Sequence, residues 1–146
     1  MILISHRGNI SGKILDMENN PYYIDTAIFL GYDVEIDIWA IDNKIFLGHD
    51  IPQYEINLNW VDKRKDKLWI HCKNLYILEI FSIFSYELNY FWHETDTITL
   101  TSKGYIWAHT GKQPIKNSIA VLPGVDEDIN YCIGICSDNI NNFKHE

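Results

Sequence analysis

The sequence lacks the long apolar run that a membrane-spanning helix requires. Such a helix needs about 20 consecutive apolar residues, and no stretch of this 146-residue chain approaches that length. The N-terminal segment, Met-Ile-Leu-Ile-Ser-His-Arg, also lacks a basic stretch before its apolar residues and a small-residue cleavage site. We therefore expect a first strand rather than a signal peptide, and a protein that begins at Met1 and remains cytoplasmic.

Cysteine is scarce, and its spacing does not form a metal-binding pair. The three cysteines are Cys72, Cys132 and Cys136, and none of them belongs to a CxxC motif. This pattern argues against a zinc ribbon and predicts free buried thiols.

Positive charge is also in short supply. The chain has 12 basic against 20 acidic residues, a formal net charge of −8. Nucleic-acid binding depends on basic side chains that neutralise phosphates, so we expect no nucleic-acid partner. An acidic protein that handles a small phosphate compound must supply positive charge locally, and a bound divalent cation is one way to do so.

The first half of the chain alternates strands and helices. Ile2 to Ser5 and Leu68 to Cys72 are short apolar runs that predict strands, and Tyr32 to Ile38 alternates with a period of two, which also indicates a strand. Asn20 and Pro21 mark a helix start that runs to Gly31. A second helix is predicted from Asn74 through Glu87 because its apolar residues share one face.

The last third contains short apolar runs with little helix between them. These runs predict strands over Tyr90–His93, Ile98–Thr101, Tyr105–Ala108, Ile119–Leu122 and Ile133–Cys136. A complete (β/α)8 barrel takes about 250 residues, so this chain can hold seven or eight strands only by omitting most outer helices. We therefore predict a single α/β domain over residues 1–146, a shortened, helix-poor TIM-like (β/α) barrel, with an open β/α sheet as the alternative.

Two acidic residues stand two positions apart on the alternating strand. Glu35 and Asp37 point to the same face, and two buried carboxylates are costly unless a cation or a proton compensates them. A divalent ion with oxygen ligands is the natural compensation. The alternative is an exposed polar face on an edge strand, which Asp33 would extend.

Two histidines follow strands near this pair. His6 ends the first strand, and His49 ends the hairpin after the acidic strand. In a parallel β/α barrel the C-terminal ends of the strands form the active-site face, so both side chains should meet Glu35 and Asp37 there. Histidine titrates near neutrality and serves as a general acid or base.

Basic residues at strand ends predict contacts to a phosphate. Arg7 follows His6, with Gly8 allowing a tight turn, and Lys73 ends the Leu68–Cys72 strand. The alternative is that both are surface charges. Downstream, His93 is the residue that we place at the rim of the same pocket, whereas Trp107-Ala108-His109-Thr110 is expected to be structural.

Short motifs in chain order resemble the glycerophosphodiester phosphodiesterase family. The family pattern HRG, G-x-D-x-E-x-D and HD, followed by an acid-x-Lys strand end and a final G-I-x-T-D, is similar to these segments: Ser5-His6-Arg7-Gly8, Gly31-Tyr32-Asp33-Val34-Glu35-Ile36-Asp37, Leu47-Gly48-His49-Asp50, Trp69-Ile70-His71-Cys72-Lys73 and Gly134-Ile135-Cys136-Ser137-Asp138.

The resemblance implies a phospholipase-C-like barrel hydrolase that is a shortened, divergent member of the family. A divalent ion would be held by Glu35 and Asp37, His6 and His49 would act as acid and base, and Arg7 and Lys73 would bind the phosphate. In that family a neighbouring hydroxyl of the substrate attacks phosphorus, and water then opens the cyclic phosphate.

The chain departs from the family pattern in three ways. The family has P-E-N-T at the start of its first helix, whereas Pro21-Tyr22-Tyr23-Ile24 lacks the glutamate. His71 replaces the third acidic ligand, and an imidazole there shifts the expected ion from Ca²⁺ toward Mg²⁺, Mn²⁺ or Zn²⁺, with Mg²⁺ favoured. The chain is also far shorter than the usual member.

These observations support three hypotheses. The favoured one is metal-dependent hydrolysis of a small phosphodiester, with a catalytically degenerate phosphate- and metal-binding module as the alternative. A third is another chemistry, such as an isomerase or lyase, that uses the same ion. Because strands with few covering helices expose apolar faces, we also expect a homodimer.

Overall fold

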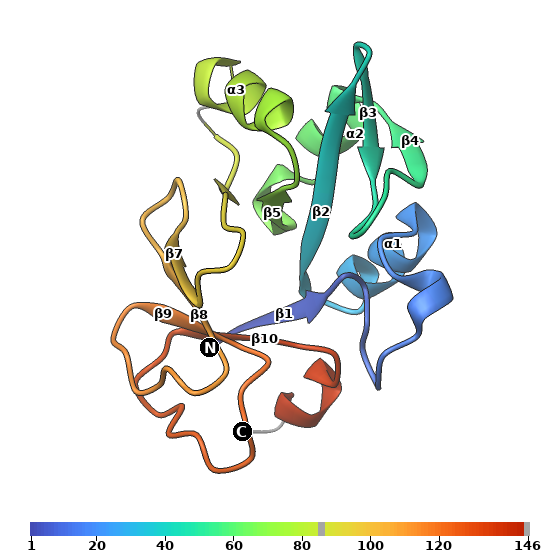
Figure 1. Ribbon diagram of the computed structural model, residues 1–146. Coiled ribbons are helices and arrows are strands. Elements are labelled where there is room, and N and C mark those ends of the chain that lie inside the picture. The colour runs from blue at the N-terminus through green and yellow to red at the C-terminus, as the bar shows by residue number, and fades with distance from the viewer. Residues whose placement is uncertain (85–86, 145–146) are drawn as a thin grey trace.

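The structure is a computed structural model that describes residues 1–84 and 87–144 (Figure 1). The α-helices of the described part are α1 (Pro21–Phe29), α2 (Leu58–Asp62) and α3 (Leu75–Phe84). Its strands are β1 (Ile2–His6), β2 (Asp33–Ile41), β3 (Lys44–Leu47), β4 (Tyr54–Ile56), β5 (Leu68–Cys72), β6 (Tyr90–Phe91), β7 (Ile98–Leu100), β8 (Ile106–His109), β9 (Ser118–Val121) and β10 (Gly134–Ser137). Single 3₁₀ turns lie at Leu15–Met17, Lys65–Lys67 and Ile140–Phe143.

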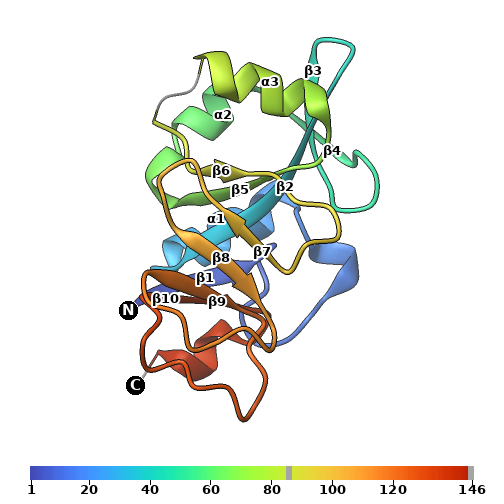
Figure 2. The ribbon, with the colours of Figure 1, turned by 60° about the vertical axis from the view of Figure 1, so that its left-hand side comes forward.

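All of these strands belong to one mixed sheet. Its parallel part runs in the order β6-β5-β2-β1-β10-β9-β8. The hairpin of β3 and β4 is antiparallel to β2, and β7 is antiparallel to β8. The sheet curls, so that β5 and β6 come to face β8 (Figure 2). Phe91 of β6 and Trp107 of β8 stack across this space with ring centroids 4.7 Å apart.

The predicted shortened (β/α) barrel is wrong. Within the described residues the strands form a curled half-barrel, in which β6 pairs only with β5 and β7 pairs only with β8. Antiparallel pairs interrupt the alternation of strand and helix that defines a (β/α)8 barrel. The open β/α sheet that was the alternative is nearer to this arrangement, although it did not anticipate the curl.

Local sequence explains why helices are missing. Asp42 and Asn43 have positive φ angles of 49° and 62°, the geometry of a tight hairpin turn. The chain therefore reverses into β3 directly after β2 instead of entering a helix. Among the described residues, α-helices occur only in the crossovers β1 to β2, β4 to β5 and β5 to β6, and the described connections from β6 to β10 contain none.

Most predicted elements of the first half are confirmed. Asn20 caps α1, accepting a hydrogen bond from the backbone N–H of Tyr22, and Pro21 is the first helical residue. Helix α3 begins as predicted and is described to Phe84, and residues 85 and 86 of the predicted helix lie outside the described part. The sequence analysis missed the short elements β4 and α2.

The two faces of the sheet are chemically different. On the outer face Val34, Ile36 and Ile38 of β2 are fully buried under α1 and α3, together with Ile70 of β5. On the inner, concave face a second buried cluster contains Ile4, Trp69, Phe91, Trp107 and Ile119. The alternation of β2 therefore turns Val34, Ile36 and Ile38 outward and leaves Glu35 and Asp37 on the concave side.

Several apolar side chains remain exposed on the helices. Tyr22 and Phe29 of α1, and Leu75 and Phe84 of α3, are largely accessible. The homodimer was predicted from exposed apolar strand faces, whereas these side chains lie on helices, and the dimer stays a prediction. Among the described residues, none of the helices is both long and apolar enough to cross a membrane.

Gly48 offers a test of how tightly the fold places the residue that follows it. Its φ is +150°, and a Cβ atom there would collide with the carbonyl oxygen of Ile51. We expect Gly48→Ala to lower the free energy of unfolding by about 2 kcal/mol or more, because strain and collision add. Gly111→Ala is the control: its φ is also positive, but nothing lies within 4 Å of the added atom. Urea denaturation measures both, and equal losses would contradict the collision.

Candidate active site

Five of the six histidines of the chain line one cavity on the concave side of the sheet. The cavity has a volume of about 90 Å³, room for roughly three water molecules at about 30 Å³ each. It is lined by His6, Arg7, Glu35, His49, His71, Phe91, His93, Trp107, His109 and Val121. Most of these residues end or follow parallel strands, whereas His49 follows the antiparallel strand β3 and Glu35 is the third residue of β2. The structure thus brings His6, Glu35 and His49 to one cavity, although the predicted barrel is wrong.

The register of the parallel strands sets the carboxylate pair beside the histidines. His6 of β1 is opposite Glu35 of β2, and Asp37 is opposite His71 of β5. Glu35 and Asp37 are 3% and 0% exposed. Asp33 instead accepts hydrogen bonds from Trp69 and Lys67 outside the cavity. The alternative of an exposed acidic face is therefore excluded for Glu35 and Asp37.

Asp37 is held as an anion by its neighbours. The side-chain amide of Asn19 donates to Asp37 Oδ2 at 2.9 Å, and the backbone N–H of Asp37 donates to Asn19 Oδ1 at 2.9 Å. Arg7 Nε lies 3.0 Å from Asp37 Oδ2, and His71 Nδ1 lies 3.0 Å from Oδ1. Burial opposes ionisation, but the contacts with His71, Arg7 and Asn19 hold the pKa of Asp37 well below its ordinary value.

The surroundings of Glu35, in contrast to those of Asp37, disfavour its ionisation. Its Oε2 atom is buried without a hydrogen-bond partner among the described residues, and the nearest histidine nitrogen, His6 Nε2, is 3.8 Å away. Burial and the charge of Asp37 raise the pKa of Glu35 to about 7. A buried carboxylate oxygen without a partner is unfavourable, so this atom indicates that a proton or a cation belongs beside it.

The contacts of His71 also indicate that a proton or a cation belongs in this group. Its Nε2 lies 3.2 Å from the backbone carbonyl oxygen of His93, which can only accept a hydrogen bond. If Nε2 carries the proton, the lone pair of Nδ1 faces Asp37 Oδ1, and two acceptors then face each other at 3.0 Å. Either a second proton or a metal ion must lie between them. A carbonyl that fixes the tautomer of a metal-binding histidine is a common arrangement.

The donor set fits a divalent ion. Glu35, Asp37 and His71 each offer a ligand atom, and these atoms lie within 4.8 Å of one another. Two carboxylates and one imidazole suit Mg²⁺, Mn²⁺ or Zn²⁺. An ion would give Glu35 Oε2 its missing partner and would separate Nδ1 of His71 from Asp37. The ligand set predicted from the sequence is thus brought together, and its occupation by a metal stays a prediction.

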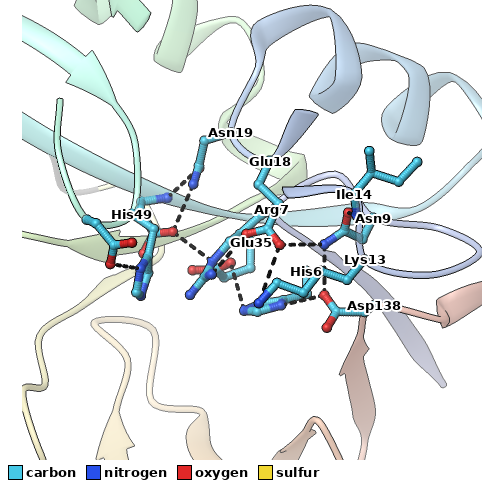
Figure 3. Close-up of polar contacts among 12 residues, drawn as sticks. His6, Arg7, Asn9, Lys13, Ile14, Glu18, Asn19, Glu35, His49 and Asp138 are labelled. Atoms are coloured by element: carbon cyan, nitrogen blue, oxygen red, sulfur yellow. Dashed lines mark hydrogen bonds and ion pairs between the residues drawn. The ribbon is translucent and has the colours of Figure 1, made fainter. Parts of the chain in front are cut away.

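Both predicted acid–base histidines have a carboxylate on the same ring nitrogen. His6 Nδ1 lies 2.7 Å from Asp138 Oδ1, and His49 Nδ1 lies 2.7 Å from Asp50 Oδ1 (Figure 3). Although burial opposes it, the hydrogen bond to Asp138 and the charge of Glu35 raise the pKa of His6. Burial, with Arg7 and Lys73, lowers the pKa of His49. In both residues the Nε2 atom is left available for proton transfer.

The two predicted phosphate-binding cations differ in their placement. Arg7 lines the cavity, but its guanidinium also contacts Glu18 and Asp37, each at 3.0 Å. Lys73 does not line the cavity; its charge lies close enough to lower the pKa values of His49 and His93. His93, predicted at the rim, is part of the wall, where its ring stacks on that of His71 with centroids 4.3 Å apart.

Sequence reasoning missed several residues of the site. Glu18 and Asn19 lie just before α1 and contact Arg7 and Asp37. Asp138 was part of a quoted motif but received no role. His109 was expected to be structural, yet it lines the cavity.

The comparisons with known proteins leave the function to be argued from this geometry. The chain matches no protein-family model, and no curated protein or solved structure is significantly similar to it. The likeness to the glycerophosphodiester phosphodiesterases therefore remains a resemblance of motifs.

The titration of Glu35 predicts a pH dependence of stability. In the metal-free protein the folded state keeps a proton on Glu35 up to a pH of about 7, whereas an unperturbed glutamate loses it near 4.5. Because the folded state binds more protons in this window, its stability should fall as pH rises from about 4.5 to about 7 and level off above. This contribution is absent in Glu35→Gln. We therefore expect the difference in free energy of unfolding between the unaltered protein and the variant to change by on the order of 1–3 kcal/mol across the window. Urea denaturation in chelator measures it, and parallel pH profiles would refute the assignment.

Proposed function

We propose that this protein is a divalent-metal-dependent phosphodiesterase that acts on a small phosphodiester in the cytoplasm. One observation carries the proposal: a metal-compatible group of Glu35, Asp37 and His71 shares a cavity with two histidines, His6 and His49, that each have a carboxylate on Nδ1. Hydrolysis of a phosphodiester needs charge stabilisation on phosphoryl oxygens and proton transfer on both sides of phosphorus. The motif resemblance points to the same reaction.

The residues that would hold the ion are Glu35, Asp37 and His71. When bound, a divalent cation would stabilise the negative charge that grows on the phosphoryl oxygens. Asn19 and Arg7 contact Asp37, so they keep this carboxylate ionised and oriented toward Glu35 and His71, the other two residues of the group. The backbone carbonyl oxygen of His93 accepts from His71 Nε2–H, a tautomer that would leave Nδ1 of His71 free to bind the ion.

The two histidine–carboxylate pairs account for the proton transfers. In each pair Nδ1–H donates to the carboxylate, so Nε2 can accept or donate a proton. One histidine takes the proton of the attacking oxygen, from a neighbouring substrate hydroxyl or from water where the substrate has none, as that oxygen bonds to phosphorus. The other gives its proton to the departing alcohol oxygen as that P–O bond breaks. A cyclic phosphate formed from a substrate hydroxyl is then opened by water, with the roles of the two histidines exchanged. In Figure 3 His6 and His49 lie on either side of Arg7 and Glu35, which suits transfers to two different oxygens.

A second, larger pocket adjoins the cavity and has space for the rest of a substrate. Its volume is about 390 Å³, and it shares Arg7 and His49 with the inner cavity. Lys13, Asp50 and Gln53 add polar groups to its wall, and Leu15 and Ile51 add apolar ones. A phosphate in the inner cavity would therefore leave one alcohol group of the diester in this pocket, beside His49.

One observation favours the alternative of a binding module without turnover. Lys73, the predicted second phosphate cation, does not line the cavity, and the charge of Arg7 is shared with Glu18 and Asp37. Positive charge for the transition state would then come almost entirely from the ion. The measurements below separate the two functions because a binding module binds metal and phosphate but does not turn over.

We expect hydrolysis of bis(p-nitrophenyl) phosphate or a glycerophosphodiester to disappear in chelator and to return with Mg²⁺, Mn²⁺ or Zn²⁺. Glu35→Ala and Asp37→Ala should abolish both metal binding and turnover, because each removes a ligand of a closely spaced set. Glu55→Ala, an exposed glutamate on β4, is the matched control and should behave as the unaltered protein. Turnover in chelator that equals turnover with metal would contradict the proposal, and metal binding without any turnover would favour the binding module.

His6→Ala and His49→Ala should each lower kcat by at least about a hundredfold while metal affinity stays within a few-fold. Asp138→Asn keeps the size of the partner of His6 but favours the wrong tautomer, so a loss of at least tenfold is expected there as well. Single-turnover kinetics and calorimetric metal titration measure the two properties separately. An unchanged rate in either histidine variant would remove that residue from the proton-transfer scheme.

A further inference from the structure

The side chains of two histidines of the cavity wall have no role in the mechanism above. His93 follows β6, and His109 ends β8, so they reach the cavity from strands that face each other across the curled sheet. Their rings meet edge to face with centroids 5.1 Å apart. The side of the cavity formed by β6 and β8 therefore presents a pair of imidazoles.

Each of these imidazoles has a ring nitrogen that is shielded from solvent and unpaired. Among the described residues, His93 Nδ1 and His109 Nε2 have no hydrogen-bond partner. A buried polar atom without a partner costs about 1–3 kcal/mol, and nearly all such atoms in proteins have one. Two unpaired nitrogens on one wall of a cavity indicate a ligand that is bound there during function.

The surrounding charges determine what kind of ligand suits this wall. Arg7 lines the same cavity, and its charge also acts on His109. His93 has one cation, Lys73, and one carboxylate, Asp37, close enough to act on it. A neutral imidazole carries one N–H donor. Positive neighbours disfavour a second cation here and favour an anionic oxygen.

We propose that His93 and His109 bind non-bridging phosphoryl oxygens as a pair of N–H donors, His93 through Nδ1–H and His109 through Nε2–H. This inference rests on the proposed function, because it names residues that hold the phosphate beside the ion at Glu35, Asp37 and His71. It also supplies what Lys73 does not, a contact to the phosphate from within the cavity.

The position of His93 is fixed by the metal-binding group itself. His71 Nε2 lies within hydrogen-bond distance of the backbone carbonyl oxygen of His93, at 3.2 Å. The two imidazole rings also stack, with an angle of 5° between their planes. The donor on His93 is thereby held at a constant place relative to His71. A donor preorganised in this way needs no rearrangement when charge develops on the phosphoryl oxygen.

The test is the affinity of the Mg²⁺-loaded protein for inorganic phosphate, measured by calorimetry. We expect His93→Ala and His109→Ala each to weaken phosphate binding by roughly ten- to a hundredfold, the range for a hydrogen bond to a charged group. Mg²⁺ affinity in the absence of phosphate should stay within a few-fold, because neither side chain is a ligand. If Mg²⁺ does not bind the unaltered protein at all, the proposed function fails, and that result is visible before phosphate is added.

Two pairs of substitutions separate a donor from a packing residue. The amide nitrogen of asparagine falls near the Nδ1 position of histidine, and that of glutamine near the Nε2 position. His93→Asn and His109→Gln should therefore retain most of the phosphate affinity, whereas His93→Phe and His109→Phe keep an aromatic ring but should lose it. The opposite order, with phenylalanine retaining affinity and the amides losing it, would show that the rings only pack.

Thermal unfolding of each variant checks that it is folded before affinity is compared. Phosphate affinity that is unchanged in both alanine variants would overturn the inference, and the unpaired nitrogens would then serve ordered water alone. Loss of phosphate affinity with rescue by the amides supports it, whether or not the protein turns over a diester.

Discussion

The burial of two carboxylates side by side on β2 is the constraint on which the rest of the site depends. Glu35 and Asp37 lie on the concave face of a curled sheet, where water cannot solvate both charges. The structure resolves half of this problem with protein groups: Asn19, Arg7 and His71 satisfy Asp37. For Glu35 the same surroundings leave one oxygen without a partner among the described residues. Because of this asymmetry, the unpaired oxygen of Glu35 is where a divalent ion would complete the charge balance of the pair.

Much of the site could be predicted from the sequence because its residues are placed by local rules. The alternation of β2 puts Glu35 and Asp37 on one face whatever the sheet does elsewhere. Parallel strands bring their C-terminal ends to one edge, so His6 and His71 meet the acidic pair through strand register alone. These rules do not require a closed barrel, so the predicted residues lie close together although the fold prediction was wrong, and their roles stay a prediction.

The rest depends on contacts that no local pattern encodes. Whether strands close into a barrel is decided by what β6, β7 and β8 pair with, and the hairpin of β7 with β8 was not visible in short apolar runs. Glu18 and Asn19 were missed because they precede the helix start at Pro21, in the turn that follows the 3₁₀ segment Leu15–Met17. His109 reaches the cavity only because the sheet curls, a property of its tertiary packing.

The pairing of β1 with β10 has a consequence for folding. His6 lies on β1 and its partner Asp138 directly follows β10, so this pair, to which we assign proton transfer, spans 132 positions of sequence. Contacts between such distant segments pay a large loop-closure entropy before they stabilise anything. During synthesis the first two-thirds of the chain can form β1, β2 and β5 with their buried carboxylates, yet the acidic partner of His6 arrives with the final strand. Glu35 and Asp37 would thus be present in a nascent chain well before the proposed proton-transfer pair of His6 and Asp138 is complete.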